Sequence, residues 1–135
     1  MKRVISVLLC VCLLFLAGGC SVKKLNTEKI RDVEFTVLEE DDIPEELLAM
    51  IREKEKAPFK ITYADKGALY IAQGYGRQQT SGYSITVEAC YETNNAVYIH
   101  TNLIGPSKEE EIVERETFPY AVVKMEFIDK NVVFQ

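Results

Sequence analysis

From Phe59 to the end of the chain, apolar residues recur mainly at every second position, which is the period of a half-buried β-strand. Turn-forming Gly, Asn, Asp and Pro residues separate the alternating segments, which are 59–63, 68–76, 84–93 and 96–104, followed by less regular extended stretches. The pattern predicts a mostly antiparallel sheet or a sandwich-like meander.

One segment before these strands has a helical period. Asp42 and Glu45 are spaced as in a capping box, and Pro44 suits a first helical turn. The apolar stripe of this segment consists of Ile43, Leu47, Leu48 and Ile51. These features predict one N-terminal helix over about 43–56, and they place the chain in the α+β class.

The two segments 84–93 and 96–104 flank an Asn-Asn pair and predict a hairpin. A two-residue loop would pair Ala89 with His100, an apolar residue with a polar one. A three-residue loop pairs Ala89 with Ile99 and gives one coherent apolar face, so this register is favoured.

In that register the second, wetter face brings together groups that could do chemistry. Cys90 opposes Tyr98, Glu88 opposes His100, and Cys90 is a diagonal neighbour of His100. A thiol hydrolase would use Cys90 as nucleophile, His100 as base and Glu88 to orient the base. A cysteine nucleophile normally lies at a helix end or loop rather than in mid-strand, so a plain cross-strand Glu-His pair is favoured. The expectation is therefore no catalytic residue and no enzyme.

The acidic clusters of the chain lack the ligand spacing of zinc or calcium sites. No phosphate-binding loop, dinucleotide fingerprint or nucleophile elbow occurs. We therefore expect no metal and no small-molecule cofactor.

The first twenty residues carry a basic pair, an apolar run and a small-residue stretch that ends at Cys20. This order is typical of a secretory signal. The sequence Leu-Ala-Gly-Gly-Cys resembles the lipobox of bacterial lipoproteins, which implies cleavage before Cys20 and lipidation of its thiol. The expected product is extracytoplasmic and is attached to the bacterial cell membrane by acyl chains on Cys20.

The resulting organisation is a signal peptide over 1–19, a tether over 20–32 and a single globular domain over 33–135. Loss of two basic residues with the signal leaves 14 of the 16 Lys and Arg against 21 Asp and Glu. A chain with this acidic balance is not expected to bind nucleic acid.

Two further segments, GRQQTSGYSITV and TFPYAVVKM, resemble the motifs of the protease complex subunit PrcB family, in its C-terminal domain. The matching residues are Gly76, Thr80, Gly82, Tyr83 and Ile85 in the first motif, and Thr117, Pro119 and Tyr120 in the second. Ser81 stands where the family favours a second glycine. The resemblance covers roughly residues 58–128.

The resemblance implies a non-enzymatic lipoprotein subunit that associates with a secreted or cell-surface protease and stabilises it. The expected partner-binding residues are Tyr75, Gly76, Arg77, Thr80, Gly82, Tyr83 and Tyr120, since aromatic and arginine side chains often anchor interfaces. Two interpretations of the 76–85 motif stay open, because its residues either shape the sheet or contact the partner. The alternative function is a protease inhibitor with loop 76–83 as its binding loop, which also resembles the loops of chagasin-like inhibitors.

Overall fold

The computed structural model describes residues 28–135. The predicted signal peptide over 1–19, the lipidation site Cys20 and most of the predicted tether lie outside the described residues. No helix within residues 28–135 is long and apolar enough to cross a membrane.

One α-helix, one short 3-10 helix and eight strands make up the described chain. They are β1 (Arg31–Asp32), β2 (Phe35–Val37), η1 (Glu40–Asp42), α2 (Glu45–Lys54), β3 (Pro58–Asp65), β4 (Ala68–Tyr75), β5 (Ser84–Glu92), β6 (Ala96–Ile104), β7 (Tyr120–Glu126) and β8 (Asn131–Phe134). The predicted α+β class with one N-terminal helix is confirmed.

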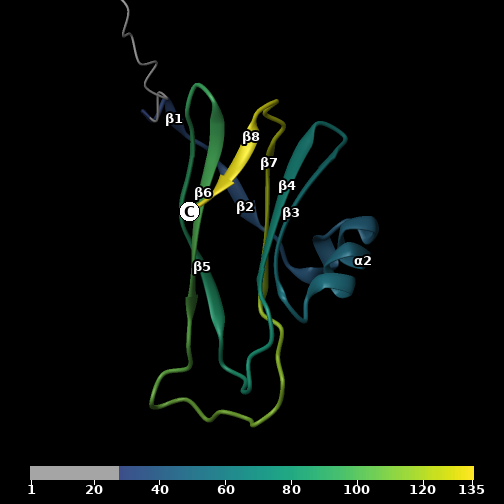
Figure 1. Cartoon of the computed structure of the whole chain (residues 1–135), viewed down its shortest axis with the longest axis vertical. Coiled ribbons are helices and arrows are strands. Elements are labelled where there is room, and N and C mark those ends of the chain that lie inside the picture. Colours follow the sequence, from purple (N-terminus) through teal and green to yellow (C-terminus); the bar gives the residue numbers. More distant parts are fainter. Residues whose placement is uncertain (1–27) are drawn as a thin grey trace, which may run out of the picture.

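The elements form three layers (Figure 1). Sheet A has the strand order β1-β5-β6-β8, and sheet B has the order β2-β7-β4-β3. The helix α2 covers the outer face of sheet B. All pairs are antiparallel except β6 and β8, which run parallel.

Strand β4 shows how its sequence builds these layers. Its first five residues are all buried, because the strand lies in the middle layer and both faces are covered. Leu69 and Ile71 point into the core between the two sheets, whereas Tyr70 and Ala72 point into a second core beneath the helix. A sheet with two apolar faces requires one layer on each side.

The predicted apolar stripe of the helix is confirmed. Ile43, Leu47 and Ile51 are buried in the core beneath the helix, and Leu48 packs against that core. The predicted capping box is wrong, since Pro44 is the N-cap and no side chain caps the helix. Asp42 instead ends the short 3-10 helix η1, two residues before the cap.

The favoured hairpin register is right in one half and wrong in the other. Ile85 pairs with Leu103 as expected, but a β-bulge between Val87 and Ala89 shifts the pairing by one residue. Beyond the bulge Ala89 pairs with His100, which is the pairing of a two-residue Asn-Asn loop. An extra residue in one strand moves every later side chain of that strand to the opposite face of the sheet from the one expected.

Two chain ends of the domain also differ from expectation. The last extended stretch was expected to join a mostly antiparallel sheet, yet β8 pairs in parallel with β6. The expected tether extended to residue 32, but Arg31 and Asp32 form β1 and pair with the end of β5. The amide of Ile30 already donates to the carbonyl of Glu92 at 2.8 Å, so the ordered contacts begin before the predicted boundary.

We predict that Leu47→Ala destabilises the domain by about 2–5 kcal/mol, because the leucine is fully buried and its loss leaves a cavity. Met50→Ala on the same helix is the matched control, since Met50 is 36% exposed. Urea denaturation followed by circular dichroism measures both. Equal midpoints for the two variants would contradict the packing of α2 on sheet B.

Candidate interaction site at the loop end

Two loops lie together at one end of the sandwich, opposite the end where β1 begins (Figure 1). The first loop, residues 76–83, joins β4 to β5, and the second, residues 105–119, joins β6 to β7. They carry the two sequence motifs that were matched separately, so the fold brings the motifs into contact.

Backbone hydrogen bonds join the two loops directly. The amide of Gln78 donates to the carbonyl of Thr117 at 2.8 Å, and the amide of Thr117 donates back to Gln78 at 3.0 Å. The Thr117 hydroxyl donates to the carbonyl of Thr80 at 2.8 Å. These contacts form an isolated antiparallel bridge that extends the sheet pairing into the loops.

A second group of contacts lies nearer the tip. The amide of Ser81 donates to the carbonyl of Val113 at 3.0 Å, and the Ser81 hydroxyl accepts from the Val113 amide at 2.8 Å. Arg77 forms a surface ion pair with Glu116 at 3.4 Å. The long second loop is thereby held along the first.

Two glycines of the motif have backbone conformations that other residues rarely adopt. Gly76 has φ of 76° and Gly82 has φ of 92°. A Cβ on Gly76 would lie 2.9 Å from the Pro58 ring, and one on Gly82 would lie 2.7 Å from Pro106. Both glycines are needed where two chain segments approach closely, so their role is architectural.

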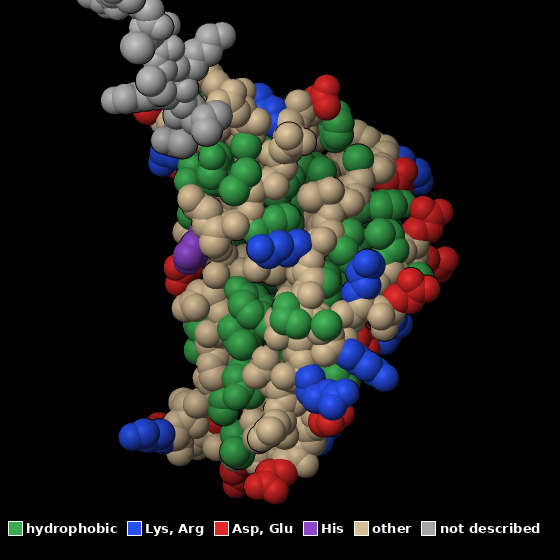
Figure 2. Space-filling model, viewed as in Figure 1, with side chains coloured by type: hydrophobic (Ala, Val, Ile, Leu, Met, Phe, Trp, Pro, Cys, Tyr) green, Lys and Arg blue, Asp and Glu red, His purple; other side chains and the backbone are tan. Residues whose placement is uncertain are grey.

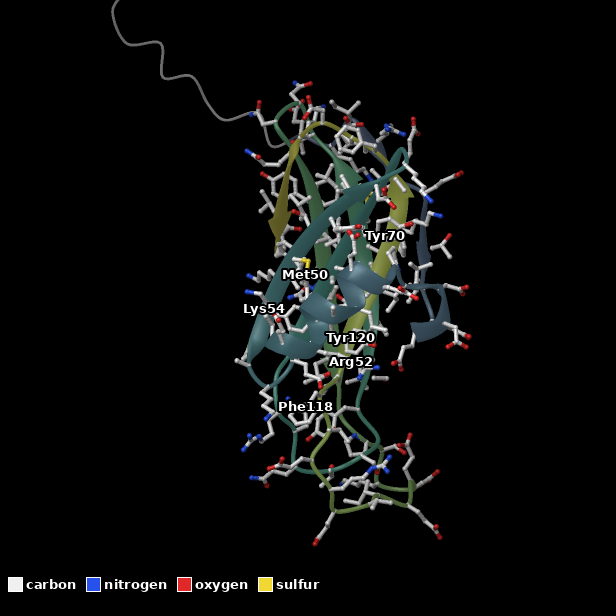
Figure 3. All side chains as sticks on the ribbon, turned by 90° about the vertical axis from the view of Figure 1, so that its right-hand side faces the viewer. Met50, Arg52, Lys54, Tyr70, Phe118 and Tyr120 are labelled. Carbon is white, nitrogen blue, oxygen red and sulfur yellow. The ribbon has the colours of Figure 1, made fainter. Side chains whose placement is uncertain are left out.

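The tyrosines of the predicted binding set do not form one patch. Tyr75 is half-buried on the face of β4 that looks toward sheet A, and its hydroxyl is hydrogen-bonded to Thr101. Tyr120 lies on the opposite face of sheet B, next to the helix, as Figure 3 shows. Burial raises the pKa of the Tyr120 hydroxyl. A single aromatic surface that includes both side chains is therefore wrong.

Of the remaining predicted residues, some are half-buried within the loops and others are exposed to solvent. Thr80 donates its hydroxyl to the carbonyl of Ser81 at 3.1 Å and is half-buried. Tyr83 is also half-buried and lies beside Gly105. Arg77 and Gly82 are exposed, so they are the members of the set that a partner can reach.

Sequence reasoning missed the most exposed apolar residues of this end. Ile112 is 48% exposed and Val113 is 56% exposed, and both belong to the second loop. The acidic residues around them are Glu109, Glu110, Glu111, Glu114 and Glu116, all exposed. Figure 2 shows acidic side chains at this end of the molecule. The sequence signal for this surface was the apolar pair Ile112-Val113 within an acidic segment. We interpreted this pair as the start of an extended segment.

Cys90 does not lie on the wet face as predicted. Beyond the bulge it pairs with Ile99 and is only 4% exposed in the core between the sheets. Burial raises the pKa of its thiol to about 11, so the thiol is neutral near pH 7. The predicted neighbour relation of Cys90 and His100 on one exposed face is therefore wrong, and this geometry argues against a Cys-His nucleophile.

The other pair on that face is an ordinary surface contact. The His100 Nε2 lies 3.1 Å from a Glu88 carboxylate oxygen, and both side chains are nearly half exposed. Tyr91 and Tyr98 stack beside them, with ring centroids 5.2 Å apart. Among residues 28–135 no group of three His, Cys, Asp or Glu side chains is arranged to hold a metal ion.

The fold and the joined loops define a β-rich α+β domain that presents a braced loop surface at one end. Residues 69–126 match the family model described as PrcB C-terminal. The matched range runs from β4 to β7 and contains both loops, which confirms the resemblance seen in the motifs. No curated protein and no solved structure matches the chain.

We predict that Gly82→Ala destabilises the domain more than Gly67→Ala. Both glycines have positive φ, so both substitutions carry a backbone cost of about 1–2 kcal/mol. Only the Cβ at position 82 meets a neighbour, whereas nothing lies within 4 Å at position 67. Thermal denaturation of the two variants measures the difference, and equal losses would show that the contact with Pro106 does not matter.

We predict that the Cys90 thiol reacts slowly with iodoacetamide at pH 7.5, because the reactive thiolate is suppressed by burial. The rate should rise as the pH approaches 11 and should increase at least a hundredfold in denaturing urea. Mass spectrometry of the peptide that contains Cys90 distinguishes it from the other cysteines. Complete reaction of the folded chain within minutes at pH 7.5 would contradict the burial.

Proposed function

We propose that this protein is a lipoprotein, anchored through Cys20 on the outer side of the bacterial cell membrane, that acts as a non-enzymatic accessory subunit of an extracellular protease. The family match indicates a role related to a protease complex. The accessory role, the anchor and the location are our proposal. In this role the loop end, defined as residues 76–83 and 105–116, contacts the protease.

The observation that carries the proposal is the bracing of the loop end. Long loops normally lose conformational entropy when they bind, which weakens association. Here the motif residues hold the second loop in place through Gln78, Ser81 and Thr117 before any partner arrives. The exposed Ile112 and Val113 are then presented on a pre-formed surface.

The position of the loop end also suits a membrane-anchored subunit. Strand β1 pairs with the last residues of β5, whereas the loop end precedes the first residue of β5. Nine residues of a strand span about 30 Å, so the chain enters the domain far from the loop end. With a lipid at Cys20, the loop end would point away from the membrane (Figure 1).

A charge cluster fixes the point where the chain enters the domain. Glu92 accepts hydrogen bonds from Arg31 at 2.8 Å and from Lys130 at 2.7 Å. The hydrogen bonds from Lys130 and Arg31 lower the pKa of the Glu92 carboxyl, so it is ionised at neutral pH. Lys130 also donates to the carbonyl of Thr93 at 2.8 Å, which connects β1 to the hairpin of sheet A and to β8.

The proposal is tested by mild crosslinking of the native lipoprotein in its own cell envelope, followed by purification, mass spectrometry and a protease assay. We expect an active protease to co-purify. Ile112→Asp with Val113→Asp should reduce its recovery at least tenfold, because two charges would be placed in the contact. Both side chains are exposed, so the fold should be retained.

The matched control is Ile30→Asp, which changes an apolar side chain that is 53% exposed at the other end of the domain. It should leave recovery unchanged. A protease that elutes silenced, and regains activity when this protein is removed, would favour the inhibitor alternative. Absence of any protease, or equal losses in both variants, would contradict the accessory role.

A further inference from the structure

The outer edge of sheet B is formed by β3, which pairs only with β4 among the described strands. The strand has eight residues, and its pairing with β4 has no bulge. A long, regular edge strand presents unpaired backbone groups and can accept a further strand. This edge belongs to neither of the two loops of the proposed protease contact.

The turn into β4 shows which backbone groups face outward. Lys66 and Gly67 both have positive φ, at 49° and 78°, as in a two-residue type I′ hairpin. Asp65 and Ala68 are then a hydrogen-bonded pair, and hydrogen-bonded pairs recur at every second residue. The N–H and C=O groups of Lys60, Thr62 and Ala64 therefore point away from β4.

The first residue of the strand agrees with this assignment. Pro58 has no N–H, and by the same alternation it occupies an outward-facing position. Pro58, Lys60, Thr62 and Ala64 are all exposed. The edge is thus open over most of its length, with three complete outward-facing peptide positions.

The surroundings of the edge can hold side chains on both faces of an added strand. On the helix side, Figure 3 shows Met50 and Lys54 next to the strand, and Met50 is partly exposed. A hollow of about 410 Å³ lies between the end of the helix and the residues from Pro58 to Lys60. On the other side, a hollow of about 320 Å³ lies between β3 and the start of β8.

The lower half of this edge is basic. The hollow beside the helix end is lined by Lys54, Lys56 and Lys60 against one acidic residue, Glu53. Figure 2 shows Lys and Arg side chains gathered on this face around the lower part of β3. The Lys60 Nζ lies over the ring of Phe134, 5.5 Å from the ring centroid. Two copies of such an edge repel each other, whereas an acidic segment is attracted.

We propose that β3 accepts an extended acidic segment of a partner protein as an additional strand of sheet B. The backbone of the segment pairs with Lys60, Thr62 and Ala64. Its carboxylates lie near Lys54 and Lys56 on the helix side of β3 and near Lys60 on the side of β8. Backbone pairing supplies affinity in this mode of recognition, and alternate side chains supply selectivity. The inference rests on the edge alone and does not depend on the proposed protease contact.

The test uses the full chain in mild detergent and a nine-residue synthetic peptide in which two glutamates alternate with two valines, so that both faces of the added strand carry carboxylates. Its matched probe has lysine in place of each glutamate. At low ionic strength we expect the glutamate peptide to bind at least tenfold more tightly in fluorescence anisotropy. Hydrogen exchange of the amides of residues 60, 62 and 64 should slow at least tenfold on binding.

Two pairs of variants separate the contributions. Thr62→Pro removes one outward N–H and should weaken binding at least tenfold, whereas Thr62→Ala keeps it and should change affinity less than threefold. Lys60→Glu should lower the affinity for the glutamate peptide at least fivefold, whereas Lys108→Glu on the distant second loop should leave this affinity unchanged. If circular dichroism shows that Thr62→Pro does not fold, the comparison of Lys60→Glu with Lys108→Glu and the hydrogen-exchange data still test the proposal.

Several results would overturn the proposal. These are equal affinity for the two peptides, absence of binding at millimolar peptide, or slowed exchange at positions other than the β3 edge. A dimer in light scattering that Thr62→Pro disrupts would make a second copy of the chain the occupant instead. A protease that co-purifies normally alongside any of these results would leave the proposed function standing.

Discussion

Sheet B must bury both of its faces, and the rest of the structure depends on this constraint. The two faces of β4 enter different cores, with Ile71 in the core between the sheets and Ala72 in the core beneath the helix. Sheet A and α2 therefore exist as layers because each covers one apolar face. Gly74 shows how tightly the core beneath the helix is filled, since a Cβ there would overlap the ring of Phe59 on the adjacent strand β3. The same packing leaves β3 at the margin, with its outward peptide groups uncovered.

Much of this fold could be predicted from the sequence because local periodicity follows burial. The helix was found from the apolar stripe of Leu47 and Ile51, both of which are fully buried. The cap was wrong because capping-box spacing is a local signal, whereas the backbone here forms a 3-10 turn before Pro44. The parallel pairing of β8 with β6 could not be predicted, since it joins segments that no short-range pattern connects.

The hairpin shows why a register is harder to predict than the strands themselves. Matching apolar residues across the turn assumed an unbroken ladder, so it could not detect the bulge at Glu88. The observed pairing is favoured by contacts that a simple apolar pattern does not count. The two rings of Tyr91 and Tyr98 stack, and the Thr93 hydroxyl accepts from the amides of Asn95 and Ala96 inside the turn. This shift moved Cys90 from the expected surface into the core, and it removed the main argument for an enzyme.

At the loop end, the sequence motifs identified the bracing residues but not the exposed apolar side chains. A motif identifies residues that a fold needs, but it does not say whether they bind a partner or hold the backbone. Gly76, Gly82 and Thr117 have the second role, because their conformations and hydrogen bonds join two loops that are far apart in sequence. Residues that brace a loop must stay inside it, so they cannot also form most of its contact surface. In the contact that we propose, the surface consists instead of side chains outside the motifs, such as Ile112 and Val113, whose identity the bracing does not constrain. Related domains could therefore keep this architecture while presenting different surfaces to different partners.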